Sequence, residues 1–116
     1  MCGITGAIAK NEKGKSAIEK IKSANDCLAK RGPDGEGIFR ENNIALGHRR
    51  LSIIDTSNNA AQPMYDASGR YVIVFNGEFF NYAGHRKTLV AQGMKFNNHS
   101  DTEVLLQLYI LHGAKC

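Results

Sequence analysis

Alternating apolar and polar stretches along the chain predict a mixture of strands and helices. The apolar run from Cys2 to Ile8 predicts a short opening strand. Residues 37–54, GIFRENNIALGHRRLSII, predict two strands joined at the polar ENN. The polar stretch DTSNNAAQPM, 55–64, predicts a long loop. YVIVFNG, 71–77, is an unbroken apolar run, which predicts a strand buried on both faces.

A first helix is predicted after the opening strand. Ser16 followed by Glu19 is a capping-box pattern, in which each side chain pairs with the backbone N–H of the other residue. Gly32, directly before a proline, marks the end of this helix. The apolar residues of its predicted inward face are Ile18, Ile21 and Leu28.

Two further helices are predicted in the second half of the chain. Residues 81–93, NYAGHRKTLVAQG, predict one that Gly84 weakens. Ser100 followed by Glu103 repeats the capping pattern at the start of SDTEVLLQLYILHG. The predicted inward residues of this last helix are Val104, Leu105, Leu108 and Leu111.

The composition is that of an ordinary globular chain. Its 116 residues suffice for one domain, with 42% hydrophobic and 22% charged residues. No apolar stretch approaches the roughly 20 residues needed to span a bilayer, so a membrane protein is not predicted. The net charge of +4 is modest, and acidic residues interrupt the lysines of 9–26. Nucleic-acid binding is therefore not predicted either.

The three cysteines, Cys2, Cys27 and Cys116, are widely spaced and odd in number. No secretory signal precedes them, so we interpret them as free thiols in a reducing, cytoplasmic compartment. Cys27 falls near the apolar face of the first predicted helix and is expected to pack there. Neither a Cys-x-x-Cys pair nor a metal-ligand spacing of histidines occurs, so no metal site is predicted.

Cys2 stands directly behind the start methionine, in MCGITGAI. An incidental buried thiol is the ordinary interpretation of a lone cysteine. Removal of Met1 would instead leave Cys2 with a thiol and a free α-amine on one carbon. Such groups titrate within about two pH units of neutrality, so one residue would supply both a nucleophile and a base. Cys2 is therefore a candidate nucleophile, whereas a retained Met1 would disable it.

Asn76 and Gly77 directly follow the apolar run 71–75. Asn-Gly is also the strongest short hairpin signal. The next residues, EFFNYAGHR, look more like a loop entering a helix than a returning strand. In that case the Asn76 amide and the Gly77 N–H could point together at a developing oxyanion.

Arg50 and Asp101 carry charges that would suit an amino-acid substrate. Arg50 precedes an apolar strand and could clamp a carboxylate, while Arg49 would face the opposite side of a regular strand. Asp101 lies at a helix start, where it could face an ammonium group. Taken singly, a surface arginine and a plain helix cap are the alternatives. His48, close to Arg50, is assigned a structural role.

The stretches MCGITGAI, RGPDGEG, LGHRRLSIID, QPM, FNGEFFNY and HSDTEVLL occur in the order and at about the spacing seen in class II glutamine amidotransferases. Over essentially its whole length the chain most resembles the glutaminase domain of glutamine-hydrolysing asparagine synthetases. The resemblance implies an α+β fold, the four-layer αββα sandwich of N-terminal-nucleophile hydrolases. Residues 1–116 would form its N-terminal portion, with the sandwich incomplete and the downstream synthetase domain absent.

The resemblance also implies a role for each candidate. Cys2 matches the nucleophile, which forms a thioester with the glutamyl group, and Asn76 with Gly77 matches the oxyanion hole. The residues that match the glutamine-binding pocket are Arg50 for the α-carboxylate, Glu78 and Asp101 for the α-ammonium, and Ile53 and Ile54 for the backbone that lines it.

Glutamine is the implied substrate, and the implied partner is an ammonia-accepting synthetase domain in the same parent chain. ATP and magnesium would belong to that domain, because no phosphate-binding glycine loop occurs in this chain and no cofactor is expected in it. Association of two copies of the chain into a homodimer is compatible with the resemblance. A glutamine-binding module or structural fragment without turnover stays open as an alternative. So does the amidotransferase domain of a sugar-modifying or β-lactam-forming relative.

Overall fold

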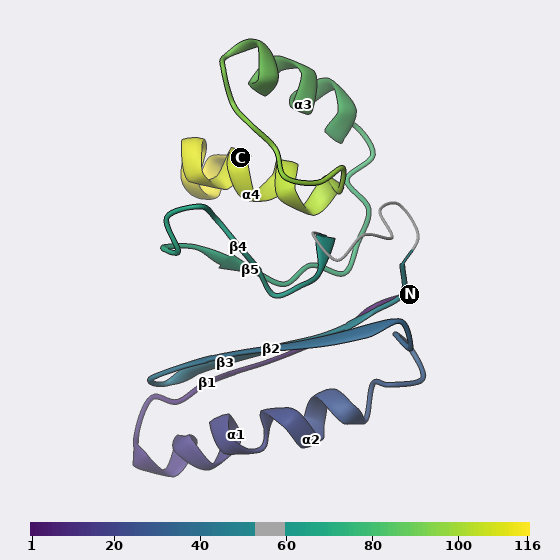
Figure 1. Ribbon diagram of the computed structural model, residues 1–116. Helices are drawn as coiled ribbons and strands as arrows, with labels where there is room; N and C mark the ends of the chain where they lie inside the picture. Colours follow the sequence, from purple (N-terminus) through teal and green to yellow (C-terminus); the bar gives the residue numbers. More distant parts are fainter. Residues whose placement is uncertain (53–59) are drawn as a thin grey trace. The chain divides into compact units, whose positions relative to one another are not determined.

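The computed structural model describes residues 1–52 and 60–116, which belong to two compact units (Figure 1). Unit 1 contains 1–52, 61–63 and 74–76, and unit 2 contains 60, 64–73 and 77–116 of the described chain. Strand pairing within each unit is antiparallel, so the fold mixes helices with antiparallel sheets, as expected for the α+β class. No helix in the described ranges is long and apolar enough to cross a bilayer.

Unit 1 is built on a three-stranded sheet with the spatial order β1-β3-β2. The strands are β1 (Gly3–Ile8), β2 (Gly35–Glu41) and β3 (Ile44–Arg50). Gly3 pairs with Arg49, and Gly35 pairs with Arg50. A two-residue turn joins β2 to β3, and its Asn42 has a φ of 47°, which asparagine tolerates better than most residues. The three predicted strands are confirmed, although β2 begins at Gly35, two residues before the predicted start at residue 37.

Two short helices cover one face of this sheet (Figure 1). They are α1 (Lys15–Glu19) and α2 (Ile21–Asp26), preceded by the 3₁₀ turn η1 (Glu12–Gly14). The prediction of one helix with a capping box at Ser16 is wrong. Asn11 supplies the cap, because its side chain accepts the N–H of Gly14 at 3.0 Å. Ser16 lies inside α1, where its hydroxyl donates to the carbonyl of Lys13.

Because side chains alternate between the two faces of a strand, every second residue of β3 points toward α1 and α2. Ala45 of β3 packs against Ile18 and Ile21 in a small buried core, which confirms these two isoleucines as inward residues. Leu28 is half-buried, and its Cδ1 atom would lie 2.9 Å from a Cβ placed on Gly3, so its side chain packs against the start of β1. Cys27 is exposed, so its predicted packing role is wrong: α2 ends one residue earlier, before the inward face reaches it.

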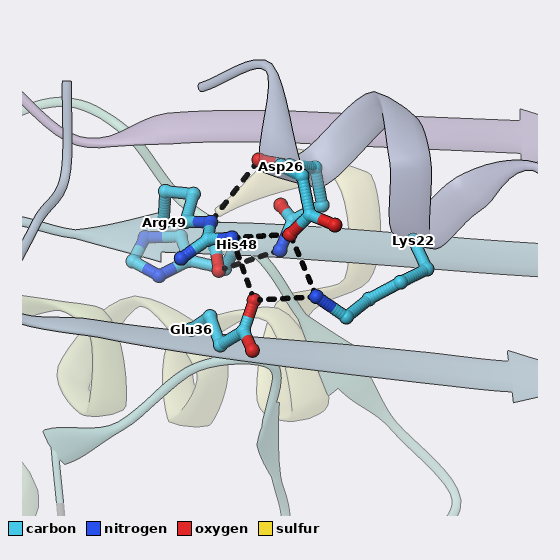
Figure 2. Close-up of polar contacts among 6 residues, drawn as sticks. Lys22, Asp26, Glu36, His48 and Arg49 are labelled. Carbon is cyan, nitrogen blue, oxygen red and sulfur yellow. Dashed lines mark hydrogen bonds and ion pairs between the residues drawn. The ribbon is translucent and has the colours of Figure 1, made fainter. Parts of the chain in front are cut away.

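Arg49 faces the helices and joins α2 to two strands (Figure 2). Its guanidinium pairs with Asp26 and, at 2.8 Å, with Glu36 of β2, while its Nε donates to the Asn25 carbonyl at 3.1 Å. Lys22 pairs with the same two carboxylates, at 2.6 Å and 3.3 Å. Hydrogen bonding to Lys22 is the main cause that lowers the pKa of Asp26. The ion pairs among Lys22, Asp26, Glu36 and Arg49, called here the Arg49 network, therefore fasten α2 to β2 and β3.

The opposite face of the sheet is covered by other parts of unit 1. A Cβ on Gly37 of β2 would lie 2.2 Å from the carbonyl oxygen of Gln62 and 2.7 Å from Cδ of Pro63. The segment 61–63 therefore lies directly on the strand at this position. His48 of β3 pairs in register with Gly37, so its side chain lies on the same face, and the residue is only 1% exposed.

Unit 2 contains a small hairpin and two helices. Its elements are β4 (Met64–Tyr65), β5 (Val72–Ile73), α3 (Tyr82–Ala91), α4 (Asp101–His112) and the 3₁₀ turn η3 (Gly113–Lys115). The predicted long, doubly buried strand over 71–77 is wrong. Only Val72 and Ile73 pair, because β4 offers them a two-residue partner, and residues 71–75 are half-buried.

Both helices predicted for the second half of the chain are confirmed. Ser100 caps α4 by accepting the N–H of Glu103 at 3.2 Å. The Glu103 carboxylate does not return the bond to Ser100, because it accepts the N–H groups of Asn97 and Asn98, both at 2.9 Å. The capping box is thus replaced by a wider network that closes the loop before α4.

The core of unit 2 lies between α3 and α4. Leu89 packs against Val104 and Leu108, with Phe79, Tyr82, Met94 and Phe96 around them. The predicted inward face of α4 is partly wrong, because Leu111 is 49% exposed whereas Leu106 is buried. Burial of α4 is concentrated in its first eight residues, and its last turn is largely exposed.

Gly37→Ala is expected to lower the free energy of unfolding by about 1–3 kcal/mol, because its methyl group would overlap the backbone of Gln62. The midpoint of urea unfolding measures this loss. Gly84→Ala in α3 is the matched control, since a Cβ there meets no atom within 4 Å and should stabilise the helix by up to about 1 kcal/mol. Equal midpoints for the two variants would contradict the packing of segment 61–63 on β2.

Candidate functional site

Cys2 comes one residue before β1, and its sulfur lies against the chain just after β3. The Sγ atom accepts the N–H of Leu51 at 3.3 Å and lies 3.5 Å from the Leu51 carbonyl oxygen, to which the thiol donates. Since Gly3 pairs with Arg49, Cys2 stands next to Arg50 in the register. The structure therefore brings the candidate nucleophile and the candidate carboxylate clamp together at one end of the β1–β3 pair.

The RGPDG stretch holds the backbone at this end of the sheet. A Cβ on Gly32 would lie 2.3 Å from the carbonyl carbon of Arg49, so a side chain there would prevent the close contact. The N–H of Asp34 donates to the Arg50 carbonyl at 2.9 Å, and its carboxylate accepts the N–H of Ser52 at 2.8 Å. The stretch thus fixes the backbone on both sides of Arg50.

His48 and Arg50 lie two residues apart in β3, so they share the sheet face opposite the helices. Neither ring nitrogen of His48 makes a hydrogen bond of normal geometry among the described residues. Burial lowers the pKa of His48; the backbone of Phe75 opposes this shift, and the charge of Arg50 adds to it. Burial therefore favours the neutral imidazole, a form that places no second positive charge beside Arg50.

Asn76 and Gly77 are exposed and lie between β5 and α3. Asn76 belongs to unit 1, as do Cys2 and Arg50, and Gly77 is the first residue of its segment in unit 2. No strand follows Asn-Gly among the described residues, since the chain enters α3 at Tyr82. The hairpin alternative is therefore wrong.

Glu78 and Asp101 are brought together within unit 2. Asp101 is the first residue of α4 and is 6% exposed. Its Oδ2 accepts the N–H of Phe79, the residue after Glu78, at 3.0 Å. The exposed Glu78 is thus carried on a loop fastened to the start of α4, as a shared binding role would require. Ile53 and Ile54 lie outside the described residues.

Gln62 is a residue of interest that the sequence analysis missed. Its side-chain Oε1 accepts the N–H of Phe75 at 2.5 Å, thirteen positions along the chain and directly before Asn76. QPM contributed to the family resemblance without a role for any of its residues. A side-chain bond to a distant backbone group leaves no periodic signal in the sequence, so only the structure identifies this contact.

The remaining reactive groups are the other cysteines and the side chains that could bind a metal ion. Cys2, Cys27 and Cys116 are all free, as predicted, and the last two are exposed. Within 1–52 and 60–116, no group of three or more His, Cys, Asp or Glu side chains could hold a metal ion. Cys2 is thus the one half-buried thiol of the described chain.

Comparisons with known proteins show what the chain is similar to. The family model described as "Glutamine amidotransferase domain" matches residues 1–116. The chain is 43% identical, over 111 residues, to asparagine synthetase [glutamine-hydrolyzing] 1 of Bacillus subtilis (strain 168), which covers 94% of the chain and 17% of that relative. It is 35% identical over 109 residues to asparagine synthetase B [glutamine-hydrolyzing] of Escherichia coli (strain K12). This match covers 94% of the chain and 19% of that relative.

A third relative has a different name. Amidase chry2 of Gibberella zeae is 36% identical over 124 residues, covering 97% of the chain and 18% of the relative. The chain therefore spans less than a fifth of the length of each of these three proteins.

The burial of His48 predicts a pH dependence of stability. Because its pKa is lower in the folded than in the unfolded state, stability is full above the ordinary value of 6.5 and falls as the pH drops below it. His48→Gln should flatten this decline, as measured by urea unfolding between pH 5 and 8. His112→Gln, at the exposed end of α4, should leave the decline unchanged. A steeper decline in the His48 variant would contradict the burial of a neutral imidazole.

Proposed function

The chain belongs to the glutamine amidotransferase domain family, and on that premise we propose that it hydrolyses the side-chain amide of glutamine to glutamate and ammonia. The placement of Cys2 carries this proposal. Its sulfur lies against the backbone of Leu51, next to Arg50 in the register of the sheet. A nucleophile and a carboxylate-binding group close together suit an enzyme that acts on a free amino acid.

In the proposed first step, Met1 has been removed and the α-amine of Cys2 takes the proton of its own thiol. The thiolate attacks the carboxamide carbon of glutamine, and the side-chain amide of Asn76 and the N–H of Gly77 donate to the oxyanion that forms. The protonated α-amine then donates to the departing nitrogen. The C–N bond breaks, ammonia leaves, and a glutamyl thioester on Cys2 remains.

In the second step, water hydrolyses the thioester. The α-amine of Cys2 accepts a proton from the attacking water, and the same two donors, Asn76 and Gly77, stabilise the second oxyanion. Collapse of this intermediate breaks the C–S bond, releases glutamate and returns the proton to the thiolate. Cys2 thus supplies the nucleophile of the first step, the leaving group of the second and the base of both.

The remaining candidates would hold the amino-acid end of glutamine. Arg50 would pair with the α-carboxylate, and Glu78 and Asp101 with the α-ammonium, while the backbone at Ile53 and Ile54 would line the pocket. The bond from the Phe79 N–H to Asp101 supports this assignment, because it fastens the loop of Glu78 to α4.

The names of the relatives suggest the larger setting. Two are glutamine-hydrolysing asparagine synthetases, so we propose that ammonia passes to a synthetase domain of the parent chain that uses ATP and magnesium. The described residues offer no ligand cluster for a metal, and every step proposed above uses side chains and backbone of this chain. The helix-covered sheet of unit 1 supports, as a further part of the proposal, the αββα sandwich of N-terminal-nucleophile hydrolases.

Incubation with 6-diazo-5-oxo-norleucine, an electrophilic glutamine analogue, is expected to add one label to Cys2 of a chain that lacks Met1. Intact mass and peptide mapping measure both changes. Cys27→Ala is the matched control, because it removes an exposed thiol and should take the label as fully as the natural chain. Cys2→Ala should take no label and release no ammonia from glutamine. Label on Cys27 or Cys116, or ammonia release by Cys2→Ala, would refute the proposal.

Arg50→Ala is expected to raise the Michaelis constant for glutamine roughly 10- to 100-fold, because a charged hydrogen bond to the substrate carboxylate contributes about 1.5–3 kcal/mol. Arg49→Ala is the control on the opposite sheet face: it should lower the unfolding midpoint through loss of the Arg49 network and leave the Michaelis constant near its natural value. Steady-state ammonia release and urea unfolding separate the two effects. The reverse pattern would assign substrate binding to Arg49.

A further inference from the structure

The backbone that leads to Asn76 lies outside any strand. β5 ends at Ile73, and residues 74–76 have no ladder partner among the described strands. The N–H of Phe75 is paired instead with a side chain, the Oε1 atom of Gln62, at 2.5 Å. In the described part of the chain, this side-chain bond stands where a sheet bond would otherwise fix the segment.

Gln62 is itself held on the sheet. Its carbonyl oxygen lies 2.2 Å from the place that a Cβ on Gly37 would take, so its backbone packs directly on β2. On the same sheet face lies the buried His48 of β3, which pairs in register with Gly37. A continuous set of contacts within unit 1 therefore runs from β2 through Gln62 to Phe75, the residue before Asn76.

The side chain of Asn76 is exposed, and no hydrogen bond to it occurs among the described residues. Its position therefore depends on the backbone that carries it. An oxyanion donor must lie about 2.7–3.1 Å from the developing charge, and a misplacement of about 1 Å can cost roughly a hundredfold in rate.

We propose that Gln62 is a positioning residue for the oxyanion hole: by holding the Phe75 N–H, it places the Asn76 amide at the reacting carbonyl. The proposal rests on the proposed function, in which Asn76 donates to the oxyanion. Gln62 touches no substrate in this scheme and acts through the backbone at Phe75.

The test uses the intact protein and two variants of similar size. Gln62→Met removes the acceptor and should lower kcat for glutamine hydrolysis roughly 10- to 100-fold, with the Michaelis constant changed less than about twofold. Gln62→Glu keeps an oxygen at the same reach and should retain most of kcat. A purely structural role would instead lower the unfolding midpoint without this split between kcat and the Michaelis constant.

A double-mutant cycle decides whether Gln62 acts through Asn76. In an Asn76→Ala background, adding Gln62→Met should lower kcat by less than about twofold, because the group to be positioned is already gone. An equal loss in both backgrounds would overturn the proposal, as would an unchanged kcat in Gln62→Met alone. If Gln62→Met does not fold, Gln62→Asn, which is one methylene too short, replaces it and should show the same loss.

The failure of this inference can be told apart from the failure of the proposed function. If Cys2→Ala still releases ammonia from glutamine, the proposed function fails and takes this inference with it. If Cys2 is required but Gln62→Met hydrolyses glutamine at the natural rate, only the positioning role is wrong.

Discussion

Two close backbone approaches, at Gly32 and Gly37, determine how unit 1 is assembled around its sheet. At Gly32 the loop after α2 lies on the backbone of Arg49, and at Gly37 the backbone of Gln62 lies on β2. Van der Waals repulsion rises so steeply that neither contact would survive an added methyl group without a shift of backbone. The same two approaches bear on the proposed chemistry, since the first loop fixes the strand end at Arg50 and the second carries Gln62, which binds the N–H of Phe75 directly before Asn76.

Elements defined by local patterns were predictable from the sequence, and elements defined by distant neighbours were not. Apolar runs of strand length predicted β1 and β3, and a serine cap predicted the start of α4. At Ser16 the same cap pattern failed, because Asn11 caps an earlier turn and the helix breaks at Lys20. The burial of 71–77 was overestimated because it depends on neighbouring strands, and the described chain supplies only the short β4.

For the site, residue types and order were enough to select the candidates, but their supports were not visible. The two-residue period of a strand correctly separated Arg49 from Arg50, whereas the partners of Arg49 come from α2 and β2. Gln62 carries no pattern at all, because its bond to Phe75 depends on where two irregular segments meet. Such contacts follow from the tertiary structure, and a single sequence does not encode them in any local signal.

The Arg49 network also has a bearing on strand register. Arg49 and Arg50 are chemically identical neighbours, so a slip of β3 by one residue would exchange them between the two sheet faces. The carboxylates of Asp26 and Glu36 bind Arg49 on the helix side of the sheet. By holding Arg49 on the helix side, the network keeps Arg50 on the opposite sheet face, beside Cys2, where the proposed function needs it.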